Sequence, residues 1–182
     1  MLFLKENLLT TKQKSEVILS YQTIYLYSHF IETGTYQGKM LDLVRYRFEK
    51  LYSIEIGKSF FLEAHKRFQS SNVSIFLGDS VEILPMLLKR IMVPAVFWLD
   101  AHYWPSSPFA KGKENCPIKT ELQFLAKHSF SHKHVILIDD YRCFIGKYGY
   151  PTERELFDLI TEYFPFHLVE VKDDIVRMTP IL

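Results

Sequence analysis

The chain has 182 residues, of which 48% are hydrophobic and 24% charged, and its formal net charge is +1. This length suits one domain with a full hydrophobic core and is too short for two ordinary domains, and the composition is that of a soluble globular protein. The near-neutral charge, with Lys and Arg scattered along the chain, argues against nucleic acid as a partner, and no apolar run approaches the length of a membrane span.

Helical and strand-like segments alternate along the first half of the chain. Residues 11–28 carry apolar side chains at mixed helical spacing, which predicts an amphipathic opening helix. Residues 1–27 are therefore expected to form an N-terminal helical extension to a core that spans 28–182. The expected elements that follow are a strand at 28–32, a helix at 37–50, a strand at 51–56, a helix at 58–69, a strand at 73–77 and a helix at 80–91.

The second half of the chain continues the alternation. Ala95–Leu99 (AVFWL) and Val135–Ile138 (VILI) are uninterrupted apolar runs, which are typical of strands buried on both faces of a parallel sheet. Helices are expected at 118–127 and 152–163, and an antiparallel hairpin is expected from 166–171 and 175–178. The sequence thus predicts an α/β fold in one domain over 1–182: a doubly wound, Rossmann-like, mostly parallel sheet with helices on both faces and a C-terminal antiparallel hairpin.

A carboxylate stands at the end of every predicted parallel strand. Unpaired charge is costly at a buried strand end, so a structural coincidence is a poor explanation for the pattern. Ligands of open α/β sheets bind beyond the carboxyl ends of the strands, and we therefore expect the functional site there. The residues are Glu32, Glu55, Asp79, Asp100 and the pair Asp139–Asp140.

The turn after the first strand, in the stretch FIETGTYQGK, has glycines at positions 34 and 38. Gly34 permits a sharp turn and a close approach to the backbone, although a plain strand–turn–helix glycine is an equal alternative. Tyr36 stands where a dinucleotide fingerprint has its middle glycine, and Glu32 would repel a pyrophosphate. The pattern favours a nucleoside that has no phosphate and bears a cation, with Glu55 suited to the two ribose hydroxyls.

These motifs together resemble those of class I S-adenosylmethionine-dependent methyltransferases, over roughly residues 28–179. The resemblance implies that the glycine turn packs against the methionine part of the cofactor and that Glu55 holds the ribose. It also implies that Asp79, with Ser80 adjacent, contacts the adenine amino group. Tyr36 departs from the commonest loop of the family. The cofactor-binding residues implied in this way are Glu32, Gly34, Thr35, Gly38, Glu55, Asp79 and Ser80.

Asp100, with Asp139 and Asp140, is similar to the metal-binding pattern of the magnesium-dependent O-methyltransferases of the catechol and macrocin type. Three carboxylates would supply oxygen ligands to Mg²⁺ or another divalent cation, which would lower the pKa of an acceptor hydroxyl. Asp100 and His102 are the candidate catalytic residues, with His102 as general base. The structural alternatives are that Asp139 only caps the turn after its strand and that His102 only forms a hydrogen bond with the neighbouring loop.

The expected acceptor is a hydroxyl of a small molecule or glycan. The loop at 102–117, which carries Tyr103, Trp104 and Phe109, is placed to form an acceptor pocket or a lid. The opening helix is a candidate to cover the site or to pair two copies of the chain as a homodimer. Cys116 and Cys143 lack CxxC spacing, which favours a cytoplasmic protein with two free thiols over a disulfide or zinc protein.

Two other classes of function stay open at this point. A nicotinamide-dependent oxidoreductase would need a Tyr–Lys pair spaced along one helical face, whereas Lys147 and Tyr148 are adjacent. A binding module that keeps the fold, and with it a nucleoside site, without catalysis would be favoured if Asp139 and Asp140 were paired to Arg142 or nearby lysines with no space for an ion. The histidines at 128, 132 and 134 are interpreted as surface residues.

Overall fold

The computed structural model describes residues 8–102 and 111–181. The expectations for Tyr103, Trp104 and Phe109 fall outside these ranges. Within them, none of the helices has both the length and the apolar character needed to cross a membrane.

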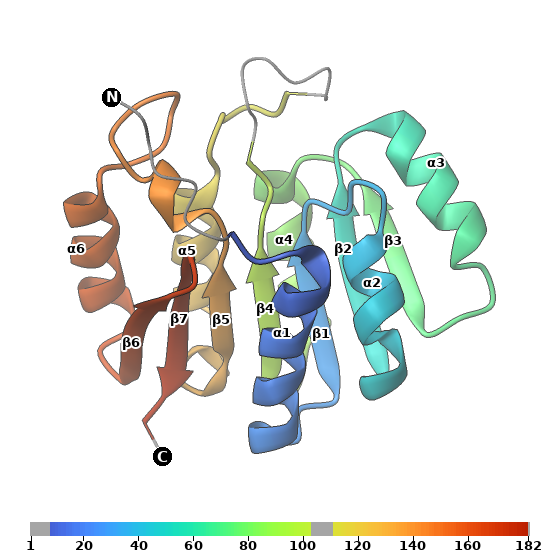
Figure 1. Cartoon of the computed structure of the whole chain (residues 1–182), viewed down its shortest axis with the longest axis horizontal. Helices are drawn as coiled ribbons and strands as arrows, with labels where there is room; N and C mark the ends of the chain where they lie inside the picture. Colours follow the sequence, from blue (N-terminus) through green and yellow to red (C-terminus); the bar gives the residue numbers. More distant parts are fainter. Residues whose placement is uncertain (1–7, 103–110, 182) are drawn as a thin grey trace.

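A seven-stranded sheet forms the centre of the molecule, with the strand order β3-β2-β1-β4-β5-β7-β6 (Figure 1). Strands β1 to β5 are parallel, and β7 pairs antiparallel with both β5 and β6. The strand order reverses between β1 and β4, which is where an open α/β sheet leaves a crevice. The bounds are β1 His29–Thr33, β2 Lys50–Glu55, β3 Val73–Leu77, β4 Ala95–Leu99, β5 Val135–Ile138, β6 His167–Lys172 and β7 Ile175–Pro180.

Helices cover both faces of the sheet, as the sequence predicts. On one face lie α1 (Thr11–Tyr25), α2 (Lys39–Val44) and α3 (Lys58–Arg67). On the other lie α4 (Ser80–Leu88), α5 (Ile118–Ala126) and α6 (Glu153–Tyr163). The mostly parallel, doubly wound sheet with a terminal antiparallel hairpin is confirmed.

Strand β4 shows why its sequence is apolar without interruption. Phe97 and Leu99 belong to the core beneath α4, α5 and α6, whereas Val96 and Trp98 belong to the core beneath α1 and α2. Successive side chains of a strand point to opposite faces, so a strand covered on both sides needs apolar residues at every position. Ile18 of α1 is fully buried in the second core, which fixes α1 against the sheet.

The expected helix at 37–50 is wrong in extent. Helix α2 ends at Val44, a 3-10 turn covers Arg45–Arg47, and β2 already begins at Lys50. The stretch RYRFEK contains no Gly or Pro to stop a helix, so local pattern favours continuation. Pairing with β1 overrides it, because Lys50 lies opposite His29 in the parallel ladder.

The surface interpretation of His134 is also wrong. Its side chain is fully buried, its Nδ1 accepts a hydrogen bond from the Ala95 N–H at 3.1 Å, and its Nε2 lies 2.7 Å from His128 Nδ1. Burial lowers the pKa of His134 to about 3. The neutral ring therefore ties the start of β4 to the start of β5, at the end of the sheet opposite the carboxyl ends.

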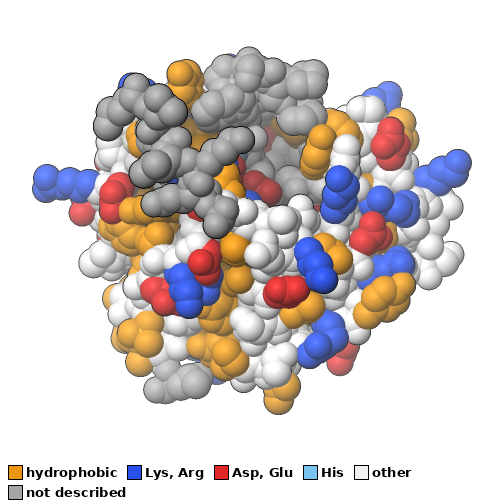
Figure 2. Space-filling view, in the orientation of Figure 1, with side chains coloured by type: hydrophobic (Ala, Val, Ile, Leu, Met, Phe, Trp, Pro, Cys, Tyr) orange, Lys and Arg blue, Asp and Glu red, His pale blue; other side chains and the backbone are white. Residues whose placement is uncertain are grey.

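On the face shown in Figure 2, acidic and basic side chains are interspersed over the described residues. That mixture agrees with the near-neutral charge of the chain and differs from the basic stripe of a nucleic-acid-binding surface.

Candidate functional site

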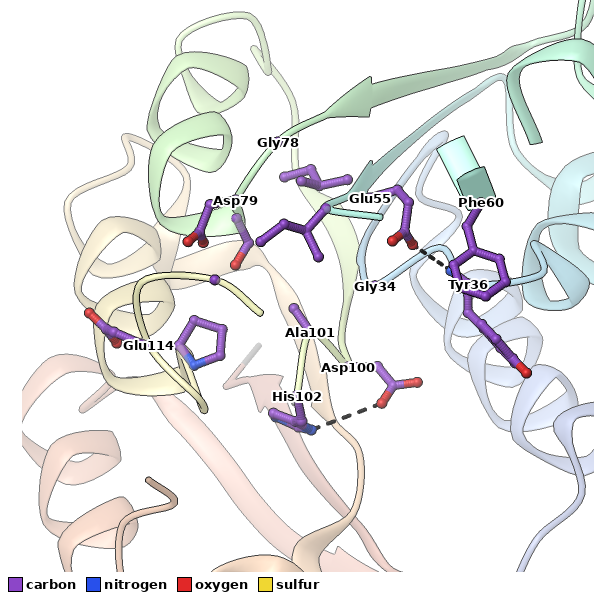
Figure 3. Close-up of a pocket in the computed structure, with 15 residues that line it drawn as sticks. Gly34, Tyr36, Glu55, Phe60, Gly78, Asp79, Asp100, Ala101, His102 and Glu114 are labelled. Carbon is purple, nitrogen blue, oxygen red and sulfur yellow. Dashed lines mark hydrogen bonds and ion pairs between the residues drawn. The ribbon is translucent and has the colours of Figure 1, made fainter. Parts of the chain in front are cut away.

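A cavity of about 230 Å³ opens at the carboxyl ends of the strands, beside the β1–β4 reversal. Figure 3 shows Glu55, Tyr36 and Phe60 together at one side of it and Asp79 and Glu114 at the other. Four of the seven predicted cofactor residues line it: Gly34, Glu55, Asp79 and Ser80. Both predicted catalytic residues, Asp100 and His102, also line it.

Gly34 is required by the fold at this point. It has a φ of +88°, and a Cβ added there would lie 2.5 Å from the backbone oxygen of Asp100. The turn after β1 therefore packs directly on the backbone that follows β4. The structure explains this glycine by the approach of two strand ends, which is the plainer of the two alternatives left by the sequence.

The Glu55 carboxylate anchors the glycine turn to the end of β2. Its Oε2 accepts a hydrogen bond from the Tyr36 N–H at 2.7 Å, and its Oε1 accepts one from the Gly57 N–H at 2.6 Å. Each carboxylate oxygen can accept a second hydrogen bond, so the group retains capacity for a ligand hydroxyl. The Tyr36 ring packs edge-on against Phe60, with 4.8 Å between centroids.

Asp79 and Ser80 begin helix α4. Asp79 is the N-cap: its Oδ1 accepts from the Val81 N–H at 3.1 Å, and its Oδ2 accepts from the Lys113 N–H at 2.7 Å. Behind Ser80, Glu121 of α5 is fully buried. Among the described residues, neither Glu121 oxygen nor the Ser80 hydroxyl completes a hydrogen bond. Burial raises the pKa of Glu121 to about 7.

Three predicted cofactor residues do not line the cavity. Glu32 is 1% exposed and accepts a hydrogen bond from the Ser53 hydroxyl at 2.7 Å, and burial raises its pKa to about 8. The Thr35 hydroxyl also lies against Ser53 Oγ, at 2.5 Å. Gly38 is the N-cap of α2 and packs against the side chain of Arg67.

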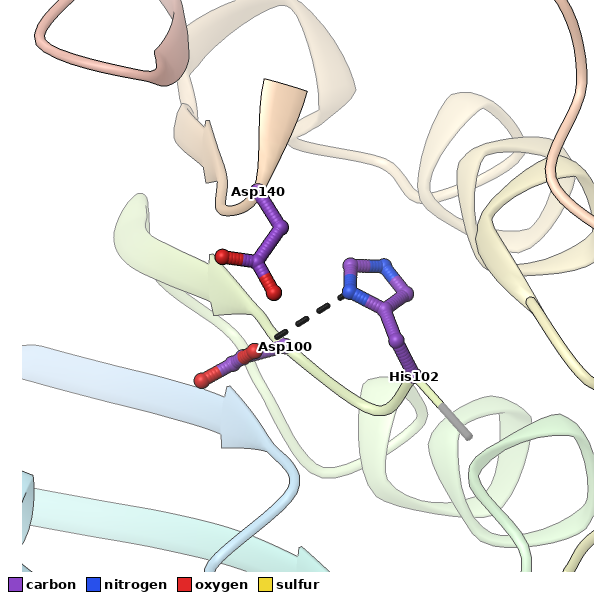
Figure 4. Close-up of side chains that lie close together, drawn as sticks. All are labelled: Asp100, His102 and Asp140. Atoms are coloured by element: carbon purple, nitrogen blue, oxygen red, sulfur yellow. Dashed lines mark ion pairs between the residues drawn. The ribbon is translucent and has the colours of Figure 1, made fainter. Parts of the chain in front are cut away.

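Asp100, His102 and Asp140 form the acid cluster, in which one ligand atom from each residue lies within 4.8 Å of the others (Figure 4). His102 Nδ1 is 3.9 Å from Asp100 Oδ1, and within the described residues neither ring nitrogen makes a hydrogen bond. The His102 side chain is 4% exposed, and burial lowers its pKa to about 4, so the ring is neutral near pH 7. Burial, then the neighbouring Asp139 and Asp140 carboxylates, raise the pKa of Asp100.

Asp139 lies outside this trio. Its Oδ2 is 2.5 Å from the Lys14 ammonium, and its Oδ1 accepts from the Asp140 N–H at 2.8 Å. Burial and then Asp140 raise its pKa to about 6. Arg142 pairs with Asp140 at 2.9 Å.

Sequence reasoning named Arg142 as a partner and missed Lys14, which lies 125 positions from Asp139. It also missed the apolar wall of the cavity, which Ile56 and Phe60 form with Tyr36. A signal for Ile56 was present, since it directly follows the strand-end acid Glu55.

No protein-family model matches the sequence, and a search of curated proteins also finds no match. Solved structures do match, and three are typical. The O-methyltransferase of Bacillus cereus in complex with SAH has 12% identity and a TM-score of 0.67, over 96% of this chain and 84% of that one. TomG, an O-methyltransferase of Streptomyces achromogenes in complex with SAM, has 15% identity and a TM-score of 0.66, over 96% and 82%.

The third is the SAH-bound methyltransferase PaMTH1 of Podospora anserina, with 12% identity and a TM-score of 0.63 over 94% of this chain and 80% of that one. In each of the three, most of the chain superposes on most of this chain. The chain therefore has the fold of the S-adenosylmethionine-dependent methyltransferases.

Proposed function

We propose that this protein is an S-adenosylmethionine-dependent methyltransferase that acts on a hydroxyl oxygen of a small molecule or glycan. The observation that carries the proposal is the cavity lined jointly by Gly34, Glu55 and Asp79, which come from the ends of three different strands. The free thiols of Cys116 and Cys143 fit a cytoplasmic setting.

The cavity offers complementary groups for the adenosine part and the sulfonium of the cofactor. The Glu55 carboxylate suits the two ribose hydroxyls, and Asp79 suits the adenine amino group. Tyr36, Ile56 and Phe60 supply apolar surface for the adenine ring. The acidic surroundings favour a sulfonium cation over a pyrophosphate.

Methyl transfer breaks the bond between the sulfonium sulfur and the methyl carbon and forms a bond from that carbon to the acceptor oxygen. The hydroxyl gives up its proton, and S-adenosylhomocysteine leaves. Since the sulfonium is already an activated donor, the protein has to place the hydroxyl in line and favour its oxyanion. His102, with a pKa of about 4, is a weak base for this purpose.

A divalent cation fits the acid cluster. His102 is nine-tenths buried with both ring nitrogens lacking hydrogen bonds in the described structure, and it faces two carboxylates. We therefore propose Asp100, His102 and Asp140 as ligands, with His102 in place of the Asp139 expected from the sequence. An imidazole in the set favours Mn²⁺ or a related ion as much as Mg²⁺. When bound, the ion would lower the pKa of the acceptor hydroxyl.

One observation favours a second candidate, a binding module that keeps the nucleoside without metal-assisted catalysis. Asp139 is already paired to Lys14, and Asp140 to Arg142.

The first test is calorimetric titration of the purified protein with S-adenosylhomocysteine, with NAD⁺ as the control ligand. We expect binding of S-adenosylhomocysteine that weakens at least tenfold in Glu55→Gln and stays unchanged in Glu63→Gln, an exposed acid of α3. An absence of binding in the wild-type protein would refute the methyltransferase, and preferential binding of NAD⁺ would favour an oxidoreductase.

A further inference from the structure

The turn between β6 and β7 reaches the loop that carries Asp140. The Tyr141 N–H donates a hydrogen bond to the backbone oxygen of Asp174 at 3.0 Å, and the Arg142 N–H donates one to Asp174 Oδ1 at 2.8 Å. Asp174 Oδ2 pairs with the Arg142 guanidinium, and the Asp174 side chain is 13% exposed. The inference drawn from these contacts rests on the proposed function, because Asp140 is one of the ligands proposed for the divalent cation.

Asp174 is an unusual residue for its place in the turn. Asp173 and Asp174 have φ values of +56° and +64°, and two successive residues of positive φ between paired antiparallel strands are typical of a type I′ turn. Glycine is the preferred residue at the second of these positions, because it has no Cβ. The turn alone therefore does not explain an Asp whose carboxylate contacts Arg142 twice.

The Arg142 guanidinium is shared between two acids. Its Nη1 lies 2.9 Å from Asp140 Oδ1 and also contacts Asp174 Oδ2. Asp174 holds Arg142 at both its N–H and its guanidinium, whereas Asp140 pairs with the guanidinium alone. A single positive charge shared by two carboxylates neutralises neither of them fully, so Asp140 retains attraction for a second cation.

The charge of the whole group matches a divalent cation when Asp174 is counted. Four carboxylates, when ionised, lie beside two cations, which leaves two negative charges. A divalent ion would neutralise these with both cations in place, whereas without the Asp174 charge it would leave a surplus positive charge in a poorly solvated place. His102 and the buried Glu32 are neutral near pH 7 and add no charge. The carboxylates are those of Asp100, Asp139, Asp140 and Asp174, and the cations are Lys14 and Arg142.

We propose that Asp174 is a positioning residue of the metal site: it holds the Arg142 guanidinium toward the β6–β7 turn and thereby leaves the Asp140 carboxylate available to the divalent cation. Asp174 acts through Arg142 and is not itself a ligand. When Asp174 loses its charge, Arg142 pairs with Asp140 instead, and the ion then has to displace the guanidinium. The C-terminal hairpin thus contributes to a site at the ends of β4 and β5.

The test is titration of the full chain with Mn²⁺, with the free ion measured by electron paramagnetic resonance. Asp174→Asn removes the charge, keeps an oxygen that can accept from the Arg142 N–H, and suits a positive φ. Asp173→Asn is the matched control, because it alters the neighbouring position of the same turn, whose carboxylate pairs with Arg177 at 2.7 Å. We expect Asp174→Asn to bind Mn²⁺ at least tenfold more weakly than the wild type and Asp173→Asn to stay within threefold of it.

Arg142→Met separates action through Arg142 from a direct effect of the Asp174 charge on the ion. If Asp174 acts through the guanidinium, Asp174→Asn should lose its effect once the guanidinium is removed. We expect the double variant Arg142→Met/Asp174→Asn to bind Mn²⁺ within threefold of Arg142→Met alone. A tenfold loss in both backgrounds would overturn the positioning role, because Asp174 would then act by its own charge.

Equal affinity of Asp174→Asn and wild type for Mn²⁺ would also overturn the inference and leave the metal site standing. An absence of Mn²⁺ binding in the wild type would overturn the metal site and the inference together. Titration of the same samples with S-adenosylhomocysteine decides the methyltransferase separately, because Glu55 and Asp79 lie outside the acid cluster. If Asp174→Asn does not fold, Asp174→Gly, which also suits a positive φ, takes its place with the same expected loss.

Discussion

Replacement of Glu121 by Gln should make the protein more resistant to rising pH. Glu121 is fully buried in α5, and no donor in the described structure completes a well-oriented hydrogen bond to its oxygens, although the Ser80 and Thr33 hydroxyls lie close to them. The nearby Ser80 and Thr33 hydroxyls only partly offset burial, which raises the pKa from 4.5 to about 7. In this pH interval the native state keeps the proton and the unfolded chain loses it, so rising pH destabilises the native state.

The size of the effect follows from the shift. One pKa unit corresponds to about 1.4 kcal/mol, so ionisation of Glu121 in the native state removes roughly 3 kcal/mol of stability by pH 8. A neutral Gln never bears this charge, although a buried amide without partners has a pH-independent penalty of about 1–3 kcal/mol. The diagnostic quantity is therefore how the difference in unfolding free energy between variant and wild type changes with pH. The other titrating groups are present in both proteins, so their contributions cancel in this difference.

Urea unfolding of wild type and Glu121→Gln between pH 5 and pH 8 measures this difference. We expect the stability of the variant, relative to wild type, to rise by roughly 2.5 kcal/mol across that range, since part of the effect is already present at pH 5. Glu63→Gln, which alters an exposed acid of α3, should show no comparable rise. A pH-independent difference for Glu121→Gln would mean that Glu121 finds a partner or is solvated, and it would refute the reasoning.

Two further predictions concern the turn after β1 and the buried histidine. Gly34→Ala should lower the free energy of unfolding by more than about 2 kcal/mol, because its Cβ would meet the Asp100 backbone at a positive φ; equal urea midpoints for variant and wild type would contradict this. His134 affects stability in the opposite sense to Glu121, because burial lowers its pKa to about 3. Its contribution to the free energy of unfolding is fully present above pH 6.5 and is lost as pH falls, by about 1.4 kcal/mol per pH unit. His134→Asn, whose Oδ1 can still accept from the Ala95 N–H, should remove this dependence, and an unchanged slope in urea titrations from pH 6.5 to pH 4.5 would show that His134 is not its source.

Strand positions were predictable where burial on both faces leaves a continuous apolar run. Ala95–Leu99 and Val135–Ile138 match the structure at both ends for this reason. The end of α2 was not predictable, because it is decided by the pairing of Lys50 with His29 in a neighbouring strand. The spacing of apolar residues along the sequence carries no information about where such strand pairing must begin.

The same distinction applies to the site. Glu55, Asp79 and Asp100 line the cavity, as expected, because the carboxyl ends of parallel strands meet at one edge, so position along each strand fixes position relative to the cavity. Gly38 and Thr35 follow the same strand and yet lie away from the cavity, because the turn folds them against Arg67 and Ser53. Their orientation depends on packing that adjacency in sequence does not encode.

Buried ionisable groups gather near the carboxyl edge of the sheet. Glu32, Glu121 and Asp139 are buried there, and burial raises the pKa of each, so each opposes folding as pH rises. Amide or apolar residues would stabilise the fold better at all three positions. Lys14 compensates only Asp139 directly. Glu32 and Glu121 do not line the cavity and Asp139 lies outside the Asp100–His102–Asp140 trio, so the penalty for burying them belongs to the fold itself and would not be relieved by direct contact with a ligand in the cavity.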